Sequence, residues 1–353
     1  MSVGQATGTR IVSLPAHMGR LRAGVSSLGA VLLSLVVGGL LIVFAGGEPI
    51  AAYGALLEGA FGTPFAIGQL LLLVFPFATI GLGLALAFRG RVYNIGAEGQ
   101  LFIGALAGGV VAIFLPLRSE PVFIAASLVA GLLGGAAWAA IVGVLRARWG
   151  VNEVITSLLL NFVAIFFFTY LVRRPLRAQG AAIDLQGREV QPEAVLSRLP
   201  ELNVHIGVVL PILLVPVVWY LMARTPFGLR VRMMGFNAEA ARAAGVNVRR
   251  MIVWLMLISG GLAGLTGAVL ILGVSGRLDL AISPGYGFTG IVVALLGRLH
   301  ALGVLLAAFF IAALQSGGQA MSVTQGLPYA IVLAIPALFI VFLLIADHLA
   351  RDT

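Results

Sequence analysis

Ten hydrophobic runs, separated by polar or glycine-rich stretches, make up about half of the chain. They occupy residues 28–45, 67–88, 101–117, 121–145, 154–172, 206–223, 251–273, 288–297, 301–315 and 328–346. Most of them approach the roughly 20 apolar residues with which an α-helix crosses about 30 Å of hydrocarbon. The pattern predicts an all-α, polytopic membrane protein with about ten transmembrane helices.

One run is too short for this purpose. The stretch "FTGIVVALLG" at 288–297 cannot cross the membrane as a straight helix. It is either a half-helix or the end of a span that begins nearer to Ser283.

A five-plus-five inverted repeat with broken helices fits ten spans, and two glycine-rich stretches resemble each other in the way it requires. "GRVYNIGAEGQLFIGALAGG" begins at Gly90, and "SPGYGFTGIVVALLG" (283–297) follows a second Gly-Arg step at Gly276. The two stretches enter the membrane from opposite sides if the spans alternate. Broken helices of such repeats tend to meet at the transport path near the middle of the membrane.

The arginines predict the orientation. With a cytoplasmic N-terminus, the loops and tails assigned to the inside hold 15 of the 22 basic residues, in agreement with the positive-inside rule. We therefore expect a cytoplasmic tail at 1–27, a transmembrane domain at 28–346 and a second cytoplasmic tail at 347–353. Within the domain, 224–250 is expected inside the cell and 173–205 outside it.

Composition narrows the class of protein. Hydrophobic residues make up 60% of the chain and charged residues 10%, and the mean hydropathy is +1.09. These values are typical of an integral membrane protein. The net charge of +9 is therefore attributed to arginines that hold cytoplasmic loops at the bilayer surface, and no nucleic-acid partner is expected. Cysteine is absent, and the four histidines (His17, His205, His300 and His348) are too far apart to predict a metal site.

The energy for transport is expected from a partner that hydrolyses ATP, with an ion gradient as the alternative. All basic residues are arginines, so the chain lacks the lysine of the Walker phosphate loop and is not expected to hydrolyse ATP. An ion-coupled secondary transporter usually needs ionisable groups deep in the membrane, where each is costly, and no predicted span has an acidic residue near its middle. The remaining alternative, a structural scaffold, would explain neither the broken segments nor the arginine-rich loop.

Polar residues near the glycine-rich stretches are the candidates for a translocation pathway. Gly96 and Gly99 allow the backbone to leave the helix, and the freed groups need protein or a wet cavity. The side chains that could satisfy these groups or face a polar solute are Asn94, Glu98, Gln100, Asn152, Glu153, Asn161 and Tyr286. The structural alternative is that Asn94, Glu98 and Gln100 anchor a span at the interface and that Asn161, which lies in mid-span, bonds between helices. The Gly-x-x-x-Gly steps at 104/108, 131/135 and 260/264 are expected to permit close helix packing.

The loop 224–250 contains a short helix by its local signals. Asn237 is a good N-cap, the alanines that follow favour helix, and Gly245 can end the helix in the left-handed conformation. So short a helix is marginal alone in water and needs a docking partner. The stretch "EAARAAG" (239–245) has the spacing of the coupling loop of ABC importer permeases, and its candidate coupling residues are Asn237, Glu239, Ala240, Ala241, Arg242 and Gly245.

Four blocks of sequence together resemble one family. They are "VYNIGAEGQLFIGALAG" (92–108), "GVNEVITSLLLNFVA" (150–164), "TPFGLRVRMMGFNAEAARAAG" (225–245) and "SPGYGFTGIVVALLG" (283–297). These blocks resemble the permeases of bacterial nucleoside and simple-sugar ABC importers, in the broader group that handles ribose and branched-chain amino acids. The "NEVI" block resembles the longer of the two permeases that pair in nucleoside importers.

This resemblance implies a set of partners and a place in the cell. It implies ATPase subunits in the cytoplasm, which bind ATP and Mg, a second and related permease, and a substrate-binding lipoprotein outside. It also implies a multi-pass protein of the bacterial inner membrane that carries nucleosides by alternating access. Simple-sugar and riboflavin importers share much of the pattern and remain alternatives.

Overall fold

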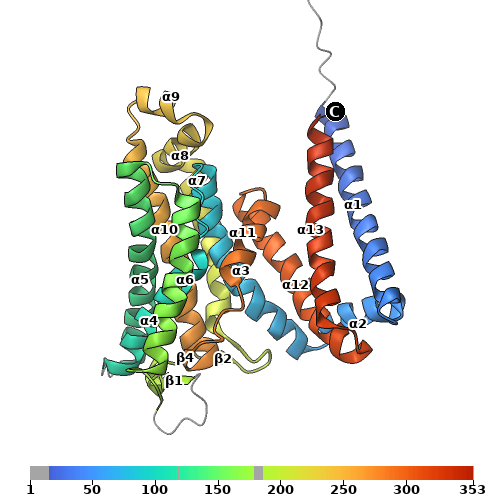
Figure 1. The fold of residues 1–353 in the computed structure, drawn as a ribbon, viewed down its shortest axis with the longest axis horizontal. Helices are drawn as coiled ribbons and strands as arrows, with labels where there is room; N and C mark the ends of the chain where they lie inside the picture. Colours follow the sequence, from blue (N-terminus) through green and yellow to red (C-terminus); the bar gives the residue numbers. More distant parts are fainter. Residues whose placement is uncertain (1–15, 116, 118, 179–185, 353) are drawn as a thin grey trace, which may run out of the picture. The chain divides into compact units, whose positions relative to one another are not determined.

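The computed structural model describes residues 16–352 except 116, 118 and 179–185. The chain divides into two compact units, one formed by the ends of the chain (1–53 and 322–353) and one by residues 54–321. In the first unit, α1 (Ala16–Phe44) and α13 (Tyr329–Asp352) pack along each other (Figure 1). The hydroxyl of Tyr53 in α2 (Pro49–Phe61) donates a hydrogen bond of 2.7 Å to the carbonyl of Leu35.

The second unit contains the remaining helices. Its long helices are α3 (Pro64–Arg89), α4 (Ala97–Phe114), α5 (Glu120–Trp149), α6 (Glu153–Arg173), α7 (Leu210–Arg224), α10 (Val248–Leu270) and α12 (Ala301–Gln325). Shorter ones are α8 (Pro226–Phe236), α9 (Ala238–Ala243) and α11 (Tyr286–Leu296), and α10 continues into a π-helical turn, η3 (Ile271–Ser275). Among the described residues, seven helices are long and apolar enough to cross a membrane, and Val31–Phe44 with Pro49–Phe61 would make an eighth as one broken span.

The prediction of about ten helices is therefore not confirmed, and nothing in the structure confirms the inverted repeat. Three segments differ from the expected loops and tails. Helix α13 continues to Asp352 within the predicted tail 347–353. Residues 46–66, expected as a short loop, hold α2, and α1 begins at Ala16 within the predicted tail 1–27. Residues 1–15 of that tail, and Thr353, lie outside the described part of the chain.

Glycine contacts form the core of the second unit. At Gly104 of α4, an added Cβ would overlap the backbone of Gly264 in α10, and at Gly135 of α5 it would overlap the carbonyl of Gly260. The helices α4, α5 and α10 pack together at these points, because only a hydrogen atom lets the backbones come so close. The predicted role of the Gly-x-x-x-Gly steps is confirmed.

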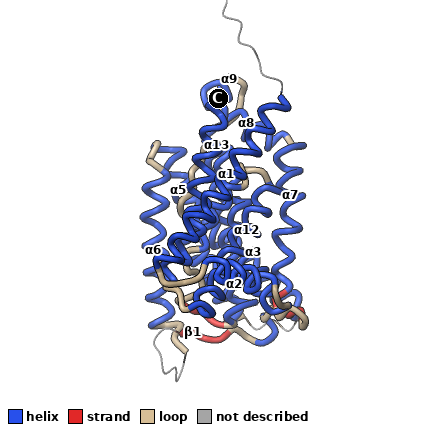
Figure 2. The backbone as a smooth tube through the Cα atoms, turned by 90° about the vertical axis from the view of Figure 1, so that its right-hand side faces the viewer, coloured by secondary structure: helices blue, strands red, loops and turns tan. Residues whose placement is uncertain are grey.

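The two ends of this unit differ in structure. At one end lie two small antiparallel ladders, β1 (Gln186–Glu189) with β4 (Arg277–Asp279) and β2 (Arg198–Leu199) with β3 (Val204–His205), and the 3-10 turns η1 (Pro192–Ala194) and η2 (Ile206–Val209). At the other end lie α8 and α9, as Figures 1 and 2 both show. The described part of loop 173–205 is thus folded onto 277–279, at the end opposite to the arginine-rich loop 224–250.

The short hydrophobic run forms a half-helix. Helix α11 has 11 residues and begins at Tyr286, where the hydroxyl of Ser283 accepts hydrogen bonds from the amides of Gly285 and Tyr286. Of the two alternatives for this run, the half-helix is correct.

Candidate functional site

An extended segment, residues 92–96, carries the chain into the protein before α4 begins. Asn94 is buried here and faces Gln100: the Asn94 amide donates to Gln100 Oε1 (2.8 Å), and the Gln100 amide donates to Asn94 Oδ1 (2.9 Å). Asn94 also donates to Ser259 Oγ of α10 and accepts from the amide of Gly96. Both donors and both acceptor sites of Asn94 are therefore used within the protein.

Asn161 of α6 holds the same segment from the other side. Its Oδ1 accepts from the amide of Gly99 (2.8 Å), and its amide donates to the carbonyl of Ile95 (2.9 Å). Ser157 Oγ accepts from the amide of Ile95. These bonds satisfy backbone groups that the broken helix leaves free inside the membrane. The expected interhelical hydrogen bonding of Asn161 is thus present.

Glu98 joins the two glycine-rich stretches. It lies in the first turn of α4, is 3% exposed, and accepts a hydrogen bond of 2.6 Å from the amide of Gly287 in the first turn of α11. An added Cβ on Gly287 would overlap the backbone of Glu98. A carboxylate at the N-terminus of α11 is favourable because the free amides there carry partial positive charge. The two broken helices therefore begin at one junction, Glu98–Gly287.

The two helices leave this junction toward opposite ends. At the end of α4, the carbonyl of Ile113 accepts from Gln191, which lies on the side of the strands. After α11 ends, Leu299 and His300 line a cavity with Arg89 and Arg232, on the side of α8. The first turns of α4 and α11 meet, as expected, but the inverted repeat is not confirmed.

A cavity of about 410 Å³ lies on the strand side of the junction. Tyr286, next to Gly287, forms part of its wall, and its ring packs edge-on against Phe77 at 5.6 Å between centroids. Polar side chains from three parts of the chain line the same cavity: Gln69 of α3, Ser275 and Asp279 after α10, and Ser316 and Gln319 of α12. Pockets of about 300–1,000 Å³ with a few convergent polar groups are typical of small-molecule sites.

Of the seven predicted pathway residues, Tyr286 is the one that lines this cavity. Asn152 caps α6 by accepting from the amides of Val154 and Ile155. Glu153 forms an ion pair of 2.5 Å with Arg146, and the same arginine donates to the carbonyl of Arg91. Asn152 and Glu153 thus anchor helix ends, at a distance in sequence and structure from the cavity lining.

Sequence reasoning missed Gln69, Ser275, Asp279, Ser316 and Gln319. A signal was present in "LQSGGQAMSVTQ" (314–325), where polar residues continue the helix beyond the apolar run that ends at 315. Gln69 stands alone before an apolar stretch, and no local pattern indicates that it faces 319.

The loop 224–250 contains the predicted short helix. Asn237 Oδ1 accepts from the amides of Glu239 (2.8 Å) and Ala240 (3.1 Å), and α9 then runs to Ala243. Gly245 has φ +84°, which is the left-handed conformation. Sequence analysis missed α8, although Thr225, which accepts from the amide of Gly228, and Pro226 are an N-cap and a proline in the first turn.

The side chains of this loop divide into a docked set and an exposed set. Ala241 of α9 is buried, and Val246 and Val248 after it are buried as well. Phe236, the last residue of α8, is 88% exposed, and Glu239 and Arg242 are exposed too. The loop therefore exposes the aromatic ring of Phe236 and the opposite charges of Glu239 and Arg242, on two helices that are both capped.

Comparison with known proteins gives one family. Residues 66–345 match the family described as branched-chain amino acid transport system / permease component. This match covers more than half of the chain, including α4, the half-helix α11, the cavity and the loop with α8 and α9. No solved structure matches the chain.

Three curated relatives align over most of their length. A glucose ABC transporter permease protein of Haloferax volcanii is 37% identical over 332 residues, which is 91% of this chain and 87% of the relative. A guanosine ABC transporter permease protein of Bacillus subtilis is 32% identical over 327 residues, 89% of this chain and 90% of the relative. A nucleoside ABC transporter permease protein of Lactococcus lactis is 27% identical over 323 residues, 89% of this chain and 88% of the relative.

Proposed function

The chain belongs to the family of branched-chain amino acid transport system permease components, and from this membership we propose that it is the membrane-spanning subunit of an ABC importer for nucleosides. It carries no ATPase site of its own, so partner ATPase subunits bind ATP and Mg in the cytoplasm. A second, related permease and a binding lipoprotein outside complete the importer. Both termini lie in the cytoplasm of a bacterium, and the chain resides in the inner membrane.

The observation that carries the proposal is the position of the cavity. It lies on the strand side and reaches Tyr286, one residue from the junction of α4 with the half-helix α11. A solute that enters there meets polar groups of Gln69, Asp279 and Gln319 before it meets the junction. Alternating access then requires α11 to shift relative to α4, which would break the Glu98–Gly287 hydrogen bond and open the path toward the α8 end.

The cavity lining is suited to a polar, partly planar solute. The ring of Tyr286 offers an aromatic surface for a base, and the amides and the Asp279 carboxylate offer partners for ribose hydroxyls. The second candidate is a simple sugar, which the relative from Haloferax volcanii favours by its 37% identity. The same hydroxyl-binding groups would bind a hexose, so only a transport assay distinguishes a nucleoside from a simple sugar as the substrate.

Coupling follows from the exposed loop. We place the ATPase subunits against α8 and α9, where Asn237, Glu239, Ala240, Ala241, Arg242 and Gly245 form or cap the short helix. A helix of six residues cannot hold its shape in water alone, but two bonds from Asn237 and the buried Ala241 fix it to the unit. Movement of an ATPase against this helix is thus transmitted to α10, which follows it directly.

The test is uptake by the complete importer in proteoliposomes. We expect uptake of guanosine to need ATP and the binding lipoprotein, to be inhibited by other nucleosides, and to be unaffected by glucose or riboflavin. Competition by glucose alone would identify sugars as the substrate class, and competition by riboflavin alone would identify riboflavin as the substrate. Uptake that followed an ion gradient without ATP would refute the proposal.

The cavity is tested by a matched pair of variants on α12. Gln319→Leu removes a polar group from the lining, and we expect a loss of about three- to ten-fold in uptake efficiency, the value of one hydrogen bond. Gln315→Leu changes the same residue type one turn earlier, outside the lining, and should leave uptake nearly unchanged. Equal effects of the two changes would remove the cavity from the path.

A further inference from the structure

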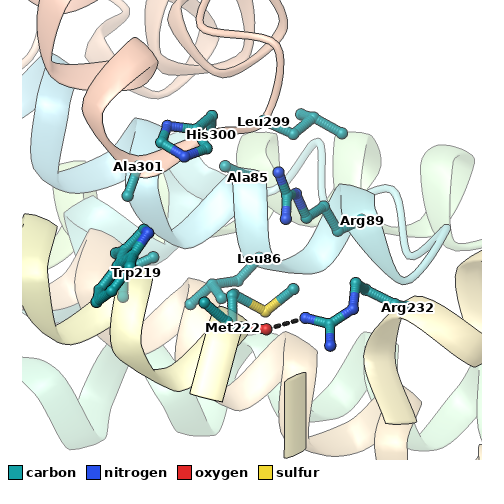
Figure 3. A pocket seen from close by; sticks show the side chains of 11 residues that line it. Ala85, Leu86, Arg89, Trp219, Met222, Arg232, Leu299, His300 and Ala301 are labelled. Atoms are coloured by element: carbon teal, nitrogen blue, oxygen red, sulfur yellow. Dashed lines mark hydrogen bonds between the residues drawn. The ribbon is translucent and has the colours of Figure 1, made fainter. Parts of the chain in front are cut away.

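A second, smaller cavity of about 130 Å³ lies at the α8 end of the large unit, apart from the cavity with Tyr286. Figure 3 shows its wall, with the guanidinium groups of Arg89 and Arg232 and the ring of His300 around it. Trp219 and Met222 of α7 and Leu86 of α3 supply apolar surface. None of the 11 lining residues is acidic.

The two arginines are held at this place by the fold. Arg89 is the last residue of α3 and is half-buried. The positive charge of Arg232 repels that of Arg89. The Arg89 guanidinium has no acidic partner among the described residues. Arg232 of α8 donates to the carbonyl of Met222, as the dashed line in Figure 3 marks.

The bond to Met222 has a simple cause. In a continuous helix the carbonyl of Met222 would accept from the amide of residue 226, but that residue is Pro226, which has no N–H. Arg232 supplies the missing donor with one Nη atom and keeps its other N–H groups for the cavity. Its position is thus determined by a helix break and not by an acidic partner.

A helix terminus adds further donors. Ala301, the first residue of the 25-residue helix α12, lines the cavity. The amide of Val304 donates to the carbonyl of His300 and is the first amide of this helix with an i→i−4 hydrogen bond. The amides before Val304 belong to the free first turn, which attracts anions. Two guanidinium groups, an imidazole and a helix N-terminus therefore converge on one small space without a negative charge in its lining.

We propose that this cavity binds a phosphate group, supplied either by the headgroup of an anionic phospholipid or by free phosphate. Guanidinium groups and helix N-termini are the usual partners of phosphate oxygens, and a bound anion would remove the repulsion between Arg89 and Arg232. The volume is below that of pockets that hold drug-sized solutes, so a nucleoside is excluded. The site goes beyond the transport function and does not depend on the identity of the transported solute.

The surroundings suit a lipid headgroup. Leu213, Val217 and Tyr220 of α7 are all exposed large apolar side chains on the helix that carries Trp219. Such a surface faces hydrocarbon in a membrane, and the Arg224 guanidinium lies 6.0 Å from the centroid of the Trp219 ring, a pairing of types common at an interface. Basic pockets between transmembrane helices at the cytoplasmic side are known sites for acidic lipids.

The experiment uses the full chain in its assembled importer, purified into nanodiscs of phosphatidylcholine with or without phosphatidylglycerol. The thermal midpoint is measured in both lipids and in a titration with inorganic phosphate, with chloride at equal ionic strength as reference. We expect a rise in the midpoint with phosphatidylglycerol, phosphate or both, and a loss of about ten-fold in apparent affinity for the effective ligand in Arg232→Gln. Arg89→Lys, which keeps the charge and removes the guanidinium fork, should weaken binding and still fold.

The control is Arg230→Gln, an exposed arginine on the same helix that does not line the cavity. A response to phosphatidylglycerol alone assigns the phosphate to a lipid, and a response to phosphate in phosphatidylcholine assigns it to a soluble anion. The proposal is overturned if neither ligand raises the midpoint or if Arg232→Gln responds as Arg230→Gln does. It is overturned as well if Arg232→Gln changes only the retention of the ATPase subunits, which would mean that the cavity receives an acidic side chain of a partner.

Discussion

At the scale of single residues, the contact between Glu98 and Gly287 joins the two glycine-rich stretches at close range. The carboxylate accepts from the amide of Gly287, and the backbones lie so close that a Cβ on Gly287 would come within 2.6 Å of the Cα of Glu98. Overpacking of this kind usually costs about 1–3 kcal/mol, because backbone cannot move aside as a flexible side chain can. Both functional stretches depend on this one glycine.

Gly287→Ala is therefore expected to lower the thermal midpoint and to abolish most uptake in proteoliposomes. The matched control is Gly54→Ala in α2, where nothing lies within 4 Å of the added Cβ and where alanine favours helix by up to about 1 kcal/mol. If Gly287→Ala unfolds at the same temperature as the wild type, the close contact between α4 and α11 is wrong.

A second residue links stability to pH. His205 is 1% exposed, packs edge-on against Phe75, and has no hydrogen-bond partner for either ring nitrogen among the described residues. Burial, and to a smaller extent the positive charge of Arg198, lowers the pKa of His205 to about 4. In the unfolded chain the pKa of histidine is about 6.5.

Between about pH 6.5 and pH 4 the unfolded chain thus binds a proton at residue 205 that the folded chain does not bind. We expect the free energy of unfolding to fall as the pH falls through this window, by at most about 1.4 kcal/mol per pH unit from this group, and not to depend on it above the window. Thermal unfolding between pH 7.5 and pH 4.5 measures the slope, and His205→Phe should flatten it. A variant with the wild-type slope would assign the pH dependence to other groups.

At the scale of elements, the loop 224–250 holds two capped helices and not one. Thr225 and Asn237 each cap a helix, and Gly245 ends α9 with φ +84°. No atom lies within 4 Å of an added Cβ at Gly245, so a larger residue would strain the backbone without a clash. The strain of a left-handed residue with a Cβ is about 1–2 kcal/mol.

Gly245→Val should give an inserted and abundant protein whose assembly binds ATP but has lost solute-stimulated hydrolysis and uptake, because the exit of α9 is distorted. Gly150→Val is the control: Gly150 has φ +67°, ends α5, and also has no atom within 4 Å of an added Cβ. Comparable losses in both variants would indicate general instability, and full transport by Gly245→Val would show that 239–245 is a plain surface loop.

At the scale of the whole molecule, the orientation in the membrane is the main prediction. The strands β1 and β4 and the helices α8 and α9 lie at opposite ends of the large unit, so one end is outside if the other is inside (Figure 2). The count of arginines places α8 and α9 inside.

The absence of cysteine from the chain makes a direct test simple. A cysteine at Gln186, in β1, should react with an impermeant thiol reagent on intact spheroplasts, and one at Ala238, in α9, should react only after the membrane is opened. The reverse pattern would invert the topology and move the coupling loop away from the ATPase.

Local features were determined by the sequence itself. The caps at Asn237 and Gly245 and the glycine steps of α4, α5 and α10 were predictable, because each depends on residues a few positions apart. The half-helix at 286–296 was one of two alternatives that the sequence left open. The family was also recognisable from four blocks of sequence. The count of about ten spans was not confirmed, because hydropathy detects an apolar run but does not show whether that run forms one straight helix or a bent or broken one.

Only the tertiary structure decided which distant residues meet. Glu98 and Gly287 are 189 positions apart, and Gln69 shares a cavity with Gln319 from another helix. Arg89, the last residue of α3, and Arg232, in the middle of α8, line one cavity only because these two helices lie side by side. Apolar periodicity and caps determine where a helix forms. Helix packing is determined by the shapes of side chains that are far apart in the sequence, and one sequence does not show which of them are in contact.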